Sequence, residues 1–239
     1  MEDREFPFEF ERKFFVNKLP KEVALHGSKQ IIIQSYVFAE DGYSVRIRVT
    51  FQGVEWTPPK FDERRDFVGG YERRVLAELI EKAEEIEQLR REQRGLFADV
   101  EGVDFGDASV PVASATVAVK SPPVKAERYE LEHELDIDVA VQILQRSARM
   151  VLKTRYSMWY EEDGWEFDVF HGKNSGLIVA ECERLTPVVN LKIPDFAVTE
   201  VTGDPRFMND SLSKEPWHGW EHQFRTELDG RGPYFMDME

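Results

Sequence analysis

The chain has 239 residues and a formal net charge of −15 at pH 7, with 41% hydrophobic and 32% charged residues. This content is enough for a core in one β-rich domain with additions, or in two small domains, and the charge argues against nucleic-acid or anionic-membrane partners. No signal segment opens the sequence, no run approaches the ~20 apolar residues of a membrane span, and Cys182 is the single cysteine. We expect a cytoplasmic protein in which Cys182 is a buried small residue.

The first part of the chain predicts strands and then a long interruption. The predicted elements are, in order, a strand at 6–16, a helix at 19–27 and strands at 31–39 and 43–51. Glu40-Asp41-Gly42 is a strong hairpin signal between the last two strands. The strand pattern then stops, and residues from about 52 to 113 form an insertion, with loop expected at 95–113.

Within the insertion, apolar residues at helical spacing predict a helix at about 71–94. Its apolar stripe is too wide to leave in water. We expect this helix to pack against the exterior of the domain or against a second subunit, which leaves a homodimer open.

The strand pattern resumes after the insertion. The predicted elements are strands at 114–120 and 127–137, a helix at 139–150, strands at 151–161, 164–171 and 176–185, and a short helix from Asp204-Pro205 to about Ser213. From Pro216 onward an acidic, Trp- and Gly-rich segment is expected to be a loosely ordered tail. The predicted organisation is one domain at 1–215, interrupted by the insertion, and a tail at 216–239.

Seven stretches carry charged residues at alternating positions, so these side chains share one face of each strand about 6.5–7 Å apart. They are Glu9, Glu11 and Lys13; Arg46 and Arg48; Lys120; Arg128, Glu130 and Glu132; Lys153 and Arg155; Glu166 and Asp168; and Glu181 and Glu183. A solvated amphipathic sheet explains any single strand. All of them together favour a barrel with a polar interior, although periodicity leaves both arrangements open.

The order of these motifs resembles one known family. The matching stretches are Glu9-Phe10-Glu11-Arg12-Lys13, Gln34-Ser35-Tyr36, Arg46-Ile47-Arg48, Lys120, Arg128 to Glu132, Lys153 to Tyr156, Trp165 to Gly172, Gly176 to Glu183, and Glu200-Val201-Thr202. This ordered set, over roughly 6–51 and 114–213, is similar to the CYTH superfamily, the triphosphate tunnel metalloenzymes.

The resemblance implies an α+β, mainly β fold: an eight-stranded antiparallel barrel with flanking helices, forming a tunnel for a triphosphate and one or two divalent cations. Three features depart from the family pattern. The insertion is larger than in a minimal member, Thr199 stands where a basic residue is frequent, and Phe196-Ala197-Val198 replaces a usual W-x-G.

The charged residues suit this chemistry in two groups. Carboxylate oxygens are natural ligands of Mg²⁺ or Mn²⁺. The candidate metal ligands are Glu9, Glu11, Asp168, Glu181 and Glu183, followed by Glu130 and Glu132. Arginine forks and lysine point charges bind phosphate oxygens. The candidate substrate-binding residues are Lys13, Arg46, Arg48, Lys120, Arg128, Lys153 and Arg155.

Catalysis by such a site would be positioning and electrostatics. We expect Lys13 and Glu132 to act directly, and Tyr36 to tune Lys13 through a hydrogen bond, although a packed strand tyrosine is the simpler interpretation. The favoured function is a metal-dependent hydrolase of inorganic triphosphate. The alternatives are a thiamine triphosphatase, an adenylyl cyclase of the same family, or a non-catalytic polyphosphate-binding module.

Overall fold

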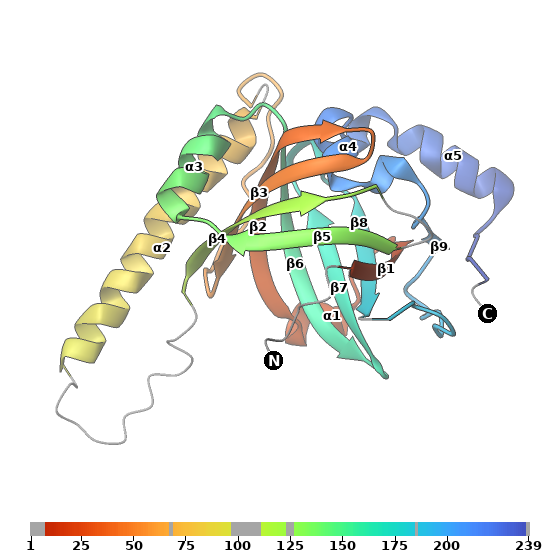
Figure 1. The fold of residues 1–239 in the computed structure, drawn as a ribbon, viewed down its shortest axis with the longest axis horizontal. Coiled ribbons are helices and arrows are strands. Elements are labelled where there is room, and N and C mark those ends of the chain that lie inside the picture. The colour runs from red at the N-terminus through yellow and green to blue at the C-terminus, as the bar shows by residue number, and fades with distance from the viewer. Residues whose placement is uncertain (1–7, 67–68, 97–110, 123–126, 185, 238–239) are drawn as a thin grey trace.

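The computed structural model describes residues 8–66, 69–96, 111–122, 127–184 and 186–237. In this part of the chain, nine antiparallel strands form one sheet with helices around it (Figure 1). The strands are β1 Phe8–Phe15, β2 Ser28–Glu40, β3 Tyr43–Gln52, β4 Ala113–Lys120, β5 Glu127–Glu134, β6 Met150–Tyr160, β7 Asp163–Phe170, β8 Ile178–Arg184 and β9 Thr199–Glu200. The helices are α1 Lys21–His26, α2 Gly70–Leu96, α3 Ile137–Arg146, α4 Asn209–Lys214 and α5 Glu221–Arg231.

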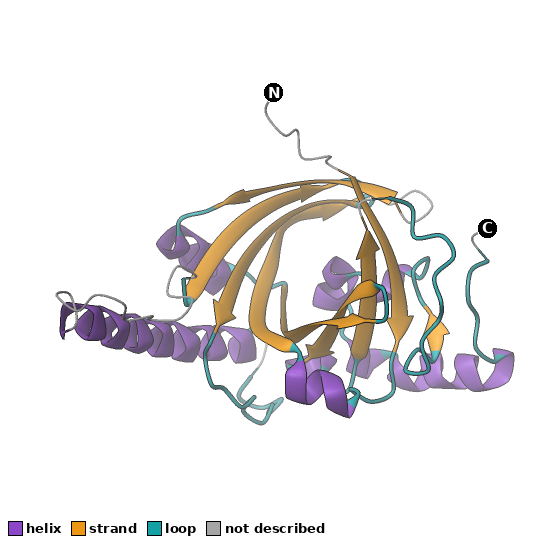
Figure 2. Cartoon of the chain, turned by 90° about the horizontal axis from the view of Figure 1, so that it is seen from below, coloured by secondary structure: helices purple, strands orange, loops and turns teal. Residues whose placement is uncertain are grey.

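The sheet closes on itself through β1. Its order is β5-β4-β3-β2-β6-β7-β8-β1-β9, and β5 pairs with β1 in addition. One edge of β1 pairs with β8, while the other pairs with β5 at Phe8–Phe10 and with β9 at Phe14 and Phe15. Strands β1 to β8 thus form the expected eight-stranded barrel, and Figure 2 shows them curving around one interior.

The β2–β3 hairpin follows the predicted turn chemistry. Asp41 and Gly42 have φ values of 50° and 80°. Positive φ at both central residues gives the tight turn whose twist matches paired strands. Glu40 therefore faces Tyr43, and the register continues to Gln30 opposite Gln52 with one irregularity between Tyr36 and Phe38.

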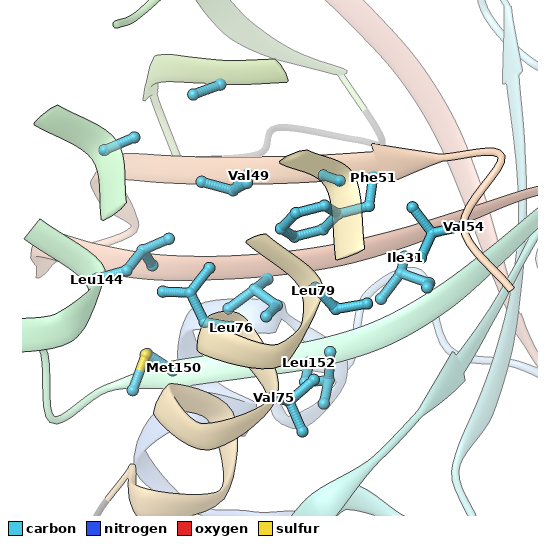
Figure 3. Packing of buried hydrophobic residues seen from close by; sticks show 14 of the residues in the cluster. Ile31, Val49, Phe51, Val54, Val75, Leu76, Leu79, Leu144, Met150 and Leu152 are labelled. Atoms are coloured by element: carbon cyan, nitrogen blue, oxygen red, sulfur yellow. The ribbon is translucent and has the colours of Figure 1, made fainter. Parts of the chain in front are cut away.

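The insertion helix packs on the outside of the barrel. Figure 3 shows α2 lying against β2, β3 and β6, where Val75, Leu76 and Leu79 meet Ile31 and Leu152. Full burial of one leucine side chain stabilises a fold by about 1.5–3 kcal/mol. The apolar face of α2 therefore contributes substantially to the stability of the fold. The predicted helix and its docking on the exterior are confirmed, whereas the predicted loop at 95–113 lies largely outside the described residues.

A second apolar cluster plugs one end of the barrel interior. On four strands the inner face changes from a charged residue to an apolar one two positions away: Lys13 to Phe15, Lys153 to Val151, Asp168 to Phe170, and Glu181 to Val179. These apolar side chains pack against Leu212, Trp217 and Phe224, which come from α4, a 3-10 turn and α5. The expected loosely ordered tail is therefore wrong, because the barrel end offers these aromatic rings an apolar surface. The domain division at residue 215 stays a prediction.

A third cluster covers the outer faces of β1, β7 and β8, where Cys182 lies fully buried with Phe14, Trp165 and Phe167. Burial raises the pKa of the Cys182 thiol to about 11, which fits the predicted structural role. No helix in the described ranges combines the length and apolarity that a bilayer span requires.

Candidate active site

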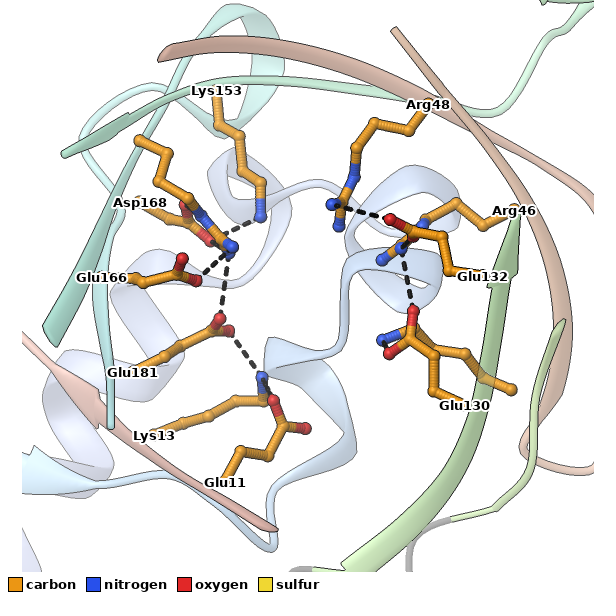
Figure 4. Close-up of polar contacts among 12 residues, drawn as sticks. Glu11, Lys13, Arg46, Arg48, Glu130, Glu132, Lys153, Glu166, Asp168 and Glu181 are labelled. Carbon is orange, nitrogen blue, oxygen red and sulfur yellow. Dashed lines mark hydrogen bonds and ion pairs between the residues drawn. The ribbon is translucent and has the colours of Figure 1, made fainter. Parts of the chain in front are cut away.

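One side of the barrel interior is rich in carboxylates. We call it the acidic wall; β1, β6, β7 and β8 supply its members, which are Glu11, Lys13, Lys153, Arg155, Glu166, Asp168 and Glu181. Strand register places them together, since Lys13 faces Glu181, Glu181 faces Glu166, and Asp168 faces Arg155. Figure 4 shows their side chains converging.

Every cation of the acidic wall is paired. The Lys13 Nζ lies 2.7 Å from Glu11 and 2.5 Å from Glu181. Arg155 forks onto Asp168 at 2.7 and 2.8 Å, reaches Glu181 at 3.0 Å, and also pairs with Glu166. Lys153 lies 2.5 Å from Asp168. In this wall the carboxylates outnumber the cations.

The pairing shifts the titration of these groups. Burial alone would raise the pKa of Glu181, but Lys13 and Arg155 outweigh it and hold that pKa well below its usual range. Burial would lower the pKa of Lys13, yet Glu11 and Glu181 raise it. For Lys153 burial wins, and with Arg155 beside it the pKa falls to about 8.

Glu183 extends the acidic wall toward the barrel end opposite the apolar plug. It lies directly across from Glu11 in the β1–β8 register and its side chain is exposed. Desolvation by the surrounding protein, and then the nearby carboxylates of Glu166, Glu11 and Glu181, raise its pKa. Glu9 faces Arg128 across the β1–β5 seam, but its side chain lies outside the described residues.

The opposite side of the interior is rich in cations. We call it the basic wall; β3, β4 and β5 supply its members, which are Arg46, Arg48, Lys120, Arg128, Glu130 and Glu132. Arg46 lies 3.0 Å from Glu130 and also pairs with Glu132, while Lys120 pairs with Glu130. Arg48 reaches Glu132 only at 4.0 Å. Burial, and then the charges of Arg46 and Arg155, lower the pKa of Arg48 to about 10.

Several buried polar atoms on this side lack a hydrogen-bond partner among the described residues. They are the Nε atoms of Arg46, Arg48 and Arg128, the Oγ1 of Thr116 and the Oε1 of Gln34. Gln34, Arg48 and Thr116 form one row across β2, β3 and β4. Sequence reasoning gave no role to Thr116 or Gln34, although both have the inward alternation of Lys120 and Tyr36.

No hydrogen bond joins Tyr36 to Lys13 among the described residues. The Tyr36 hydroxyl instead accepts a hydrogen bond of 2.8 Å from the Gln34 Nε2. Burial raises the pKa of Tyr36 above its usual value, so it stays neutral near pH 7. The expected tuning of Lys13 by Tyr36 is absent from this structure because Glu11 and Glu181 occupy the ammonium instead.

The two walls face one another across the interior (Figure 4). A linear polyanion lying between them would receive hydrogen bonds from the arginine Nε atoms of the basic wall that lack a partner among the described residues. A divalent cation beside it would relieve the repulsion among the carboxylates of the acidic wall. Within the described chain no three carboxylate, histidine or cysteine side chains already form a metal-binding group. The donor types nonetheless suit Mg²⁺ or Mn²⁺, since the crowded groups are hard carboxylate oxygens.

Comparison with known proteins identifies a relative by sequence. No protein-family model matches the chain. An inorganic triphosphatase of Acetivibrio thermocellus is 36% identical over 107 residues, which are 44% of this chain and 69% of that protein. This match covers more than two thirds of the relative.

Solved structures give weaker likenesses. A crystal structure of an inorganic triphosphatase has a TM-score of 0.46 and 21% identity, covering 86% of this chain and 93% of the other. A conserved hypothetical protein from Pyrococcus furiosus has a TM-score of 0.38 and 14% identity, covering 75% and 80%. Scores below 0.5 do not establish a shared fold, so the assignment rests on the sequence relative and on the motifs. By these two observations, the chain belongs to the CYTH superfamily of triphosphate tunnel metalloenzymes.

Proposed function

We propose that this protein hydrolyses triphosphorylated compounds, with inorganic triphosphate as the favoured substrate, and that the reaction requires Mg²⁺ or Mn²⁺. The observation that carries the proposal is the set of buried arginine Nε donors on the basic wall that have no partner in the described part of the chain, together with the crowded carboxylates of the acidic wall. A protein that only bound anions would need the guanidinium donors but not the crowded carboxylates. The inorganic triphosphatase relative supports the same reaction class.

The basic wall would bind the phosphate chain. Arg46, Arg48 and Arg128 offer Nε donors that have no partner within the described ranges, and charge-assisted bonds to phosphate contribute about 1.5–3 kcal/mol each. Lys120, Lys153, Arg155 and Lys13 are the remaining substrate-binding candidates. Their present carboxylate partners would exchange for phosphate oxygens and a cation as the substrate enters.

The acidic wall would hold the cation. Glu11, Glu181 and Glu183 are our first candidates for its ligands, because Glu11 faces Glu183 in the β1–β8 register and Glu181 lies two residues away on the same face; Glu9 remains a candidate from its motif. Asp168 and Glu181 both have their oxygens occupied by cations, Asp168 by Lys153 and Arg155 and Glu181 by Lys13 and Arg155, so a bound cation would displace these partners. Glu130 and Glu132 belong to the basic wall. When bound, the cation would neutralise charge developing on the phosphate oxygens.

The protein's own residues would supply positioning and a polar environment. Water attacks a terminal phosphorus, one phosphoanhydride bond breaks, and orthophosphate and pyrophosphate result. Arg48 on β3 and Arg155 on β6 come from opposite walls and would stabilise charge on the phosphoryl oxygens. Glu132, which is partly exposed, stays our candidate for orienting the water. Cytoplasmic location and a homodimer stay predictions from the sequence.

A substrate panel tests the proposal. Purified protein is offered inorganic triphosphate, ATP, thiamine triphosphate and pyrophosphate, each with Mg²⁺, Mn²⁺ or excess chelator, while phosphate, pyrophosphate and cyclic nucleotide are measured. We expect phosphate release to be fastest from inorganic triphosphate and to vanish in chelator. Cyclic nucleotide as the main product, or full turnover in chelator, would overturn the proposal.

A further inference from the structure

The edge of β1 that faces β5 and β9 has a gap in its strand pairing at Glu11–Lys13. Residues just beyond β9 fill this gap at Lys13. The Lys13 N–H donates to the Thr202 Oγ1 at 3.0 Å, and the Val201 N–H donates to the Lys13 carbonyl at 2.8 Å. The backbone that carries the Lys13 ammonium into the interior is thus held from outside by residues 201 and 202.

Thr202 is itself held by a buried ion pair. Its hydroxyl donates to the Glu200 Oε1 at 2.7 Å while accepting from Lys13. Glu200 also receives two bonds from Arg12, at 2.9 and 2.6 Å, and one from the Met236 N–H at 2.7 Å. The Arg12 and Glu200 side chains are only 3% and 1% exposed. The Arg12 and Met236 bonds hold the Glu200 carboxylate in place, and that carboxylate in turn orients the Thr202 hydroxyl.

This arrangement, the β1 clamp, consists of Arg12, Glu200, Thr202 and the backbone of Met236. Arg12 stands between Glu11 and Lys13 in sequence, so it points outward while they point into the interior. Any shift of β1 at this point would move both inward side chains. Lys13 bridges Glu11 and Glu181, which are two of the carboxylates assigned to the cation.

We propose that Thr202 is a positioning residue for the proposed hydrolysis, and that the β1 clamp sets the place of Lys13 and Glu11 in the active site. The inference rests on the proposed function. The Thr202 hydroxyl contacts the Lys13 N–H and the Glu200 carboxylate, so its role is to act through the Lys13 amide. The C-terminal segment near Met236 takes part through its N–H, which binds the same Glu200 carboxylate.

Matched variants at residue 202 test the idea. Thr202→Val keeps the shape but removes the acceptor, so the Lys13 N–H loses its partner. We expect kcat for inorganic triphosphate to fall roughly 10–100-fold, the scale of a small displacement, with KM within about threefold of wild type. Thr202→Ser keeps the hydroxyl and should restore kcat to within about threefold of wild type.

Asp66→Asn is the control for a general loss of stability. Asp66 is 2% exposed and pairs with Arg74 at 2.9 and 3.0 Å, outside the barrel interior. Asp66→Asn should lower the midpoint of thermal unfolding and leave kcat within about twofold of wild type. Equal kcat losses in Thr202→Val and Thr202→Ser, an equal loss in Asp66→Asn, or wild-type kcat in folded Thr202→Val would each overturn the proposal.

Two further measurements separate this proposal from the proposed function. Amide exchange at Lys13 needs no turnover and should be faster in Thr202→Val than in wild type or Thr202→Ser; equal exchange would overturn the clamp even if hydrolysis is confirmed. Absence of hydrolysis in wild type would instead refute the function.

A second pair of variants is used if Thr202→Val does not fold. Met236→Pro, which removes the N–H that binds Glu200, is then compared with Met236→Ala. We expect kcat to fall about fivefold only in the proline variant, as for one lost hydrogen bond; equal values would overturn the proposal.

Discussion

The inner and outer faces of the same strands carry opposite chemistry. On β2, Ile31 and Ile33 point outward and lie under α2, whereas Gln34 and Tyr36 belong to the polar interior. Most barrels of this size fill their interior with side chains and expose polar ones. Here the charges are inside, and α2 covers the apolar outer face of β2, β3 and β6. Burying paired charges contributes little net stability, so the inner face is explained by ligand binding and the outer face by folding.

This difference predicts that activity and stability separate by face. Inward changes should lower activity while the barrel stays folded, and outward changes should lower stability while the folded fraction stays active. The following variants test the separation in order of expected effect.

Glu181→Gln should have the largest effect. It removes a charge that Lys13 and Arg155 share, so both the cation site and the placement of Lys13 are lost. We expect kcat to fall roughly 10²–10³-fold, as for loss of one preorganised electrostatic group. The fold should persist, because Lys13 keeps Glu11 and Arg155 keeps Asp168. Circular dichroism and phosphate release measure the two effects, and Glu85→Gln, an exposed α2 position, is the matched control. Turnover like that of the control would contradict the assignment.

Arg48→Ala tests the basic wall. Arg48 approaches a carboxylate only at 4.0 Å, and that carboxylate, Glu132, also pairs with Arg46, so the loss of Arg48 leaves no carboxylate stranded. We expect triphosphate binding to weaken roughly 10–100-fold, equivalent to the 1.5–3 kcal/mol of a charge-assisted contact. Calorimetry with inorganic triphosphate measures it. The dissociation constant of Arg48→Lys should lie between those of wild type and Arg48→Ala, since lysine keeps the charge but lacks the paired donors of the guanidinium. An unchanged dissociation constant in Arg48→Ala would place the phosphates elsewhere.

Leu76→Ala tests the outer face. Leu76 on α2 is fully buried against the barrel, so truncation leaves a cavity under β2 and β3. We expect the free energy of unfolding to fall by about 2–5 kcal/mol, with kcat per folded molecule unchanged. Urea unfolding and active-fraction titration give the two quantities. Leu89→Ala, at an exposed position on α2, should change neither the free energy of unfolding nor kcat. A kcat loss in a folded Leu76→Ala protein would show that the two faces are coupled.

The sequence predicts the strands and the shared face of each charged set well, because alternation is a local property. Which face lies inside is not local, and only the family resemblance supplied it. The plug was missed because Trp217 and Phe224 have no strand or helix period around them. The Arg12–Glu200 pair joins residues 188 apart, so no local pattern reveals it. The absence of a Lys13–Tyr36 bond likewise depends on Glu181, which another strand brings in.

The smallest expected effect concerns His171, where the insertion meets the outer barrel. Its Nε2 lies 2.8 Å from the Thr154 hydroxyl, and its ring packs edge-on against Trp56, with centroids 5.4 Å apart. Burial, and then the charge of Lys29, lower the pKa of His171 to about 4. The unfolded chain binds the proton near pH 6.5, so the stability contribution is complete above that pH and is lost as the pH falls from 6.5 to 4.

At pH 5 the loss should reach about 2 kcal/mol relative to pH 7, from 1.36 kcal/mol for each unit below 6.5. Urea unfolding of wild type and His171→Gln at both pH values measures it. The carboxylates titrate alike in the two proteins, so the extra loss in wild type isolates the histidine. We expect the difference in stability between the two proteins to narrow on acidification. A difference that stays constant would mean that His171 takes up its proton at the same pH in the folded and the unfolded protein, so that burial at the junction between insertion and barrel does not lower its pKa.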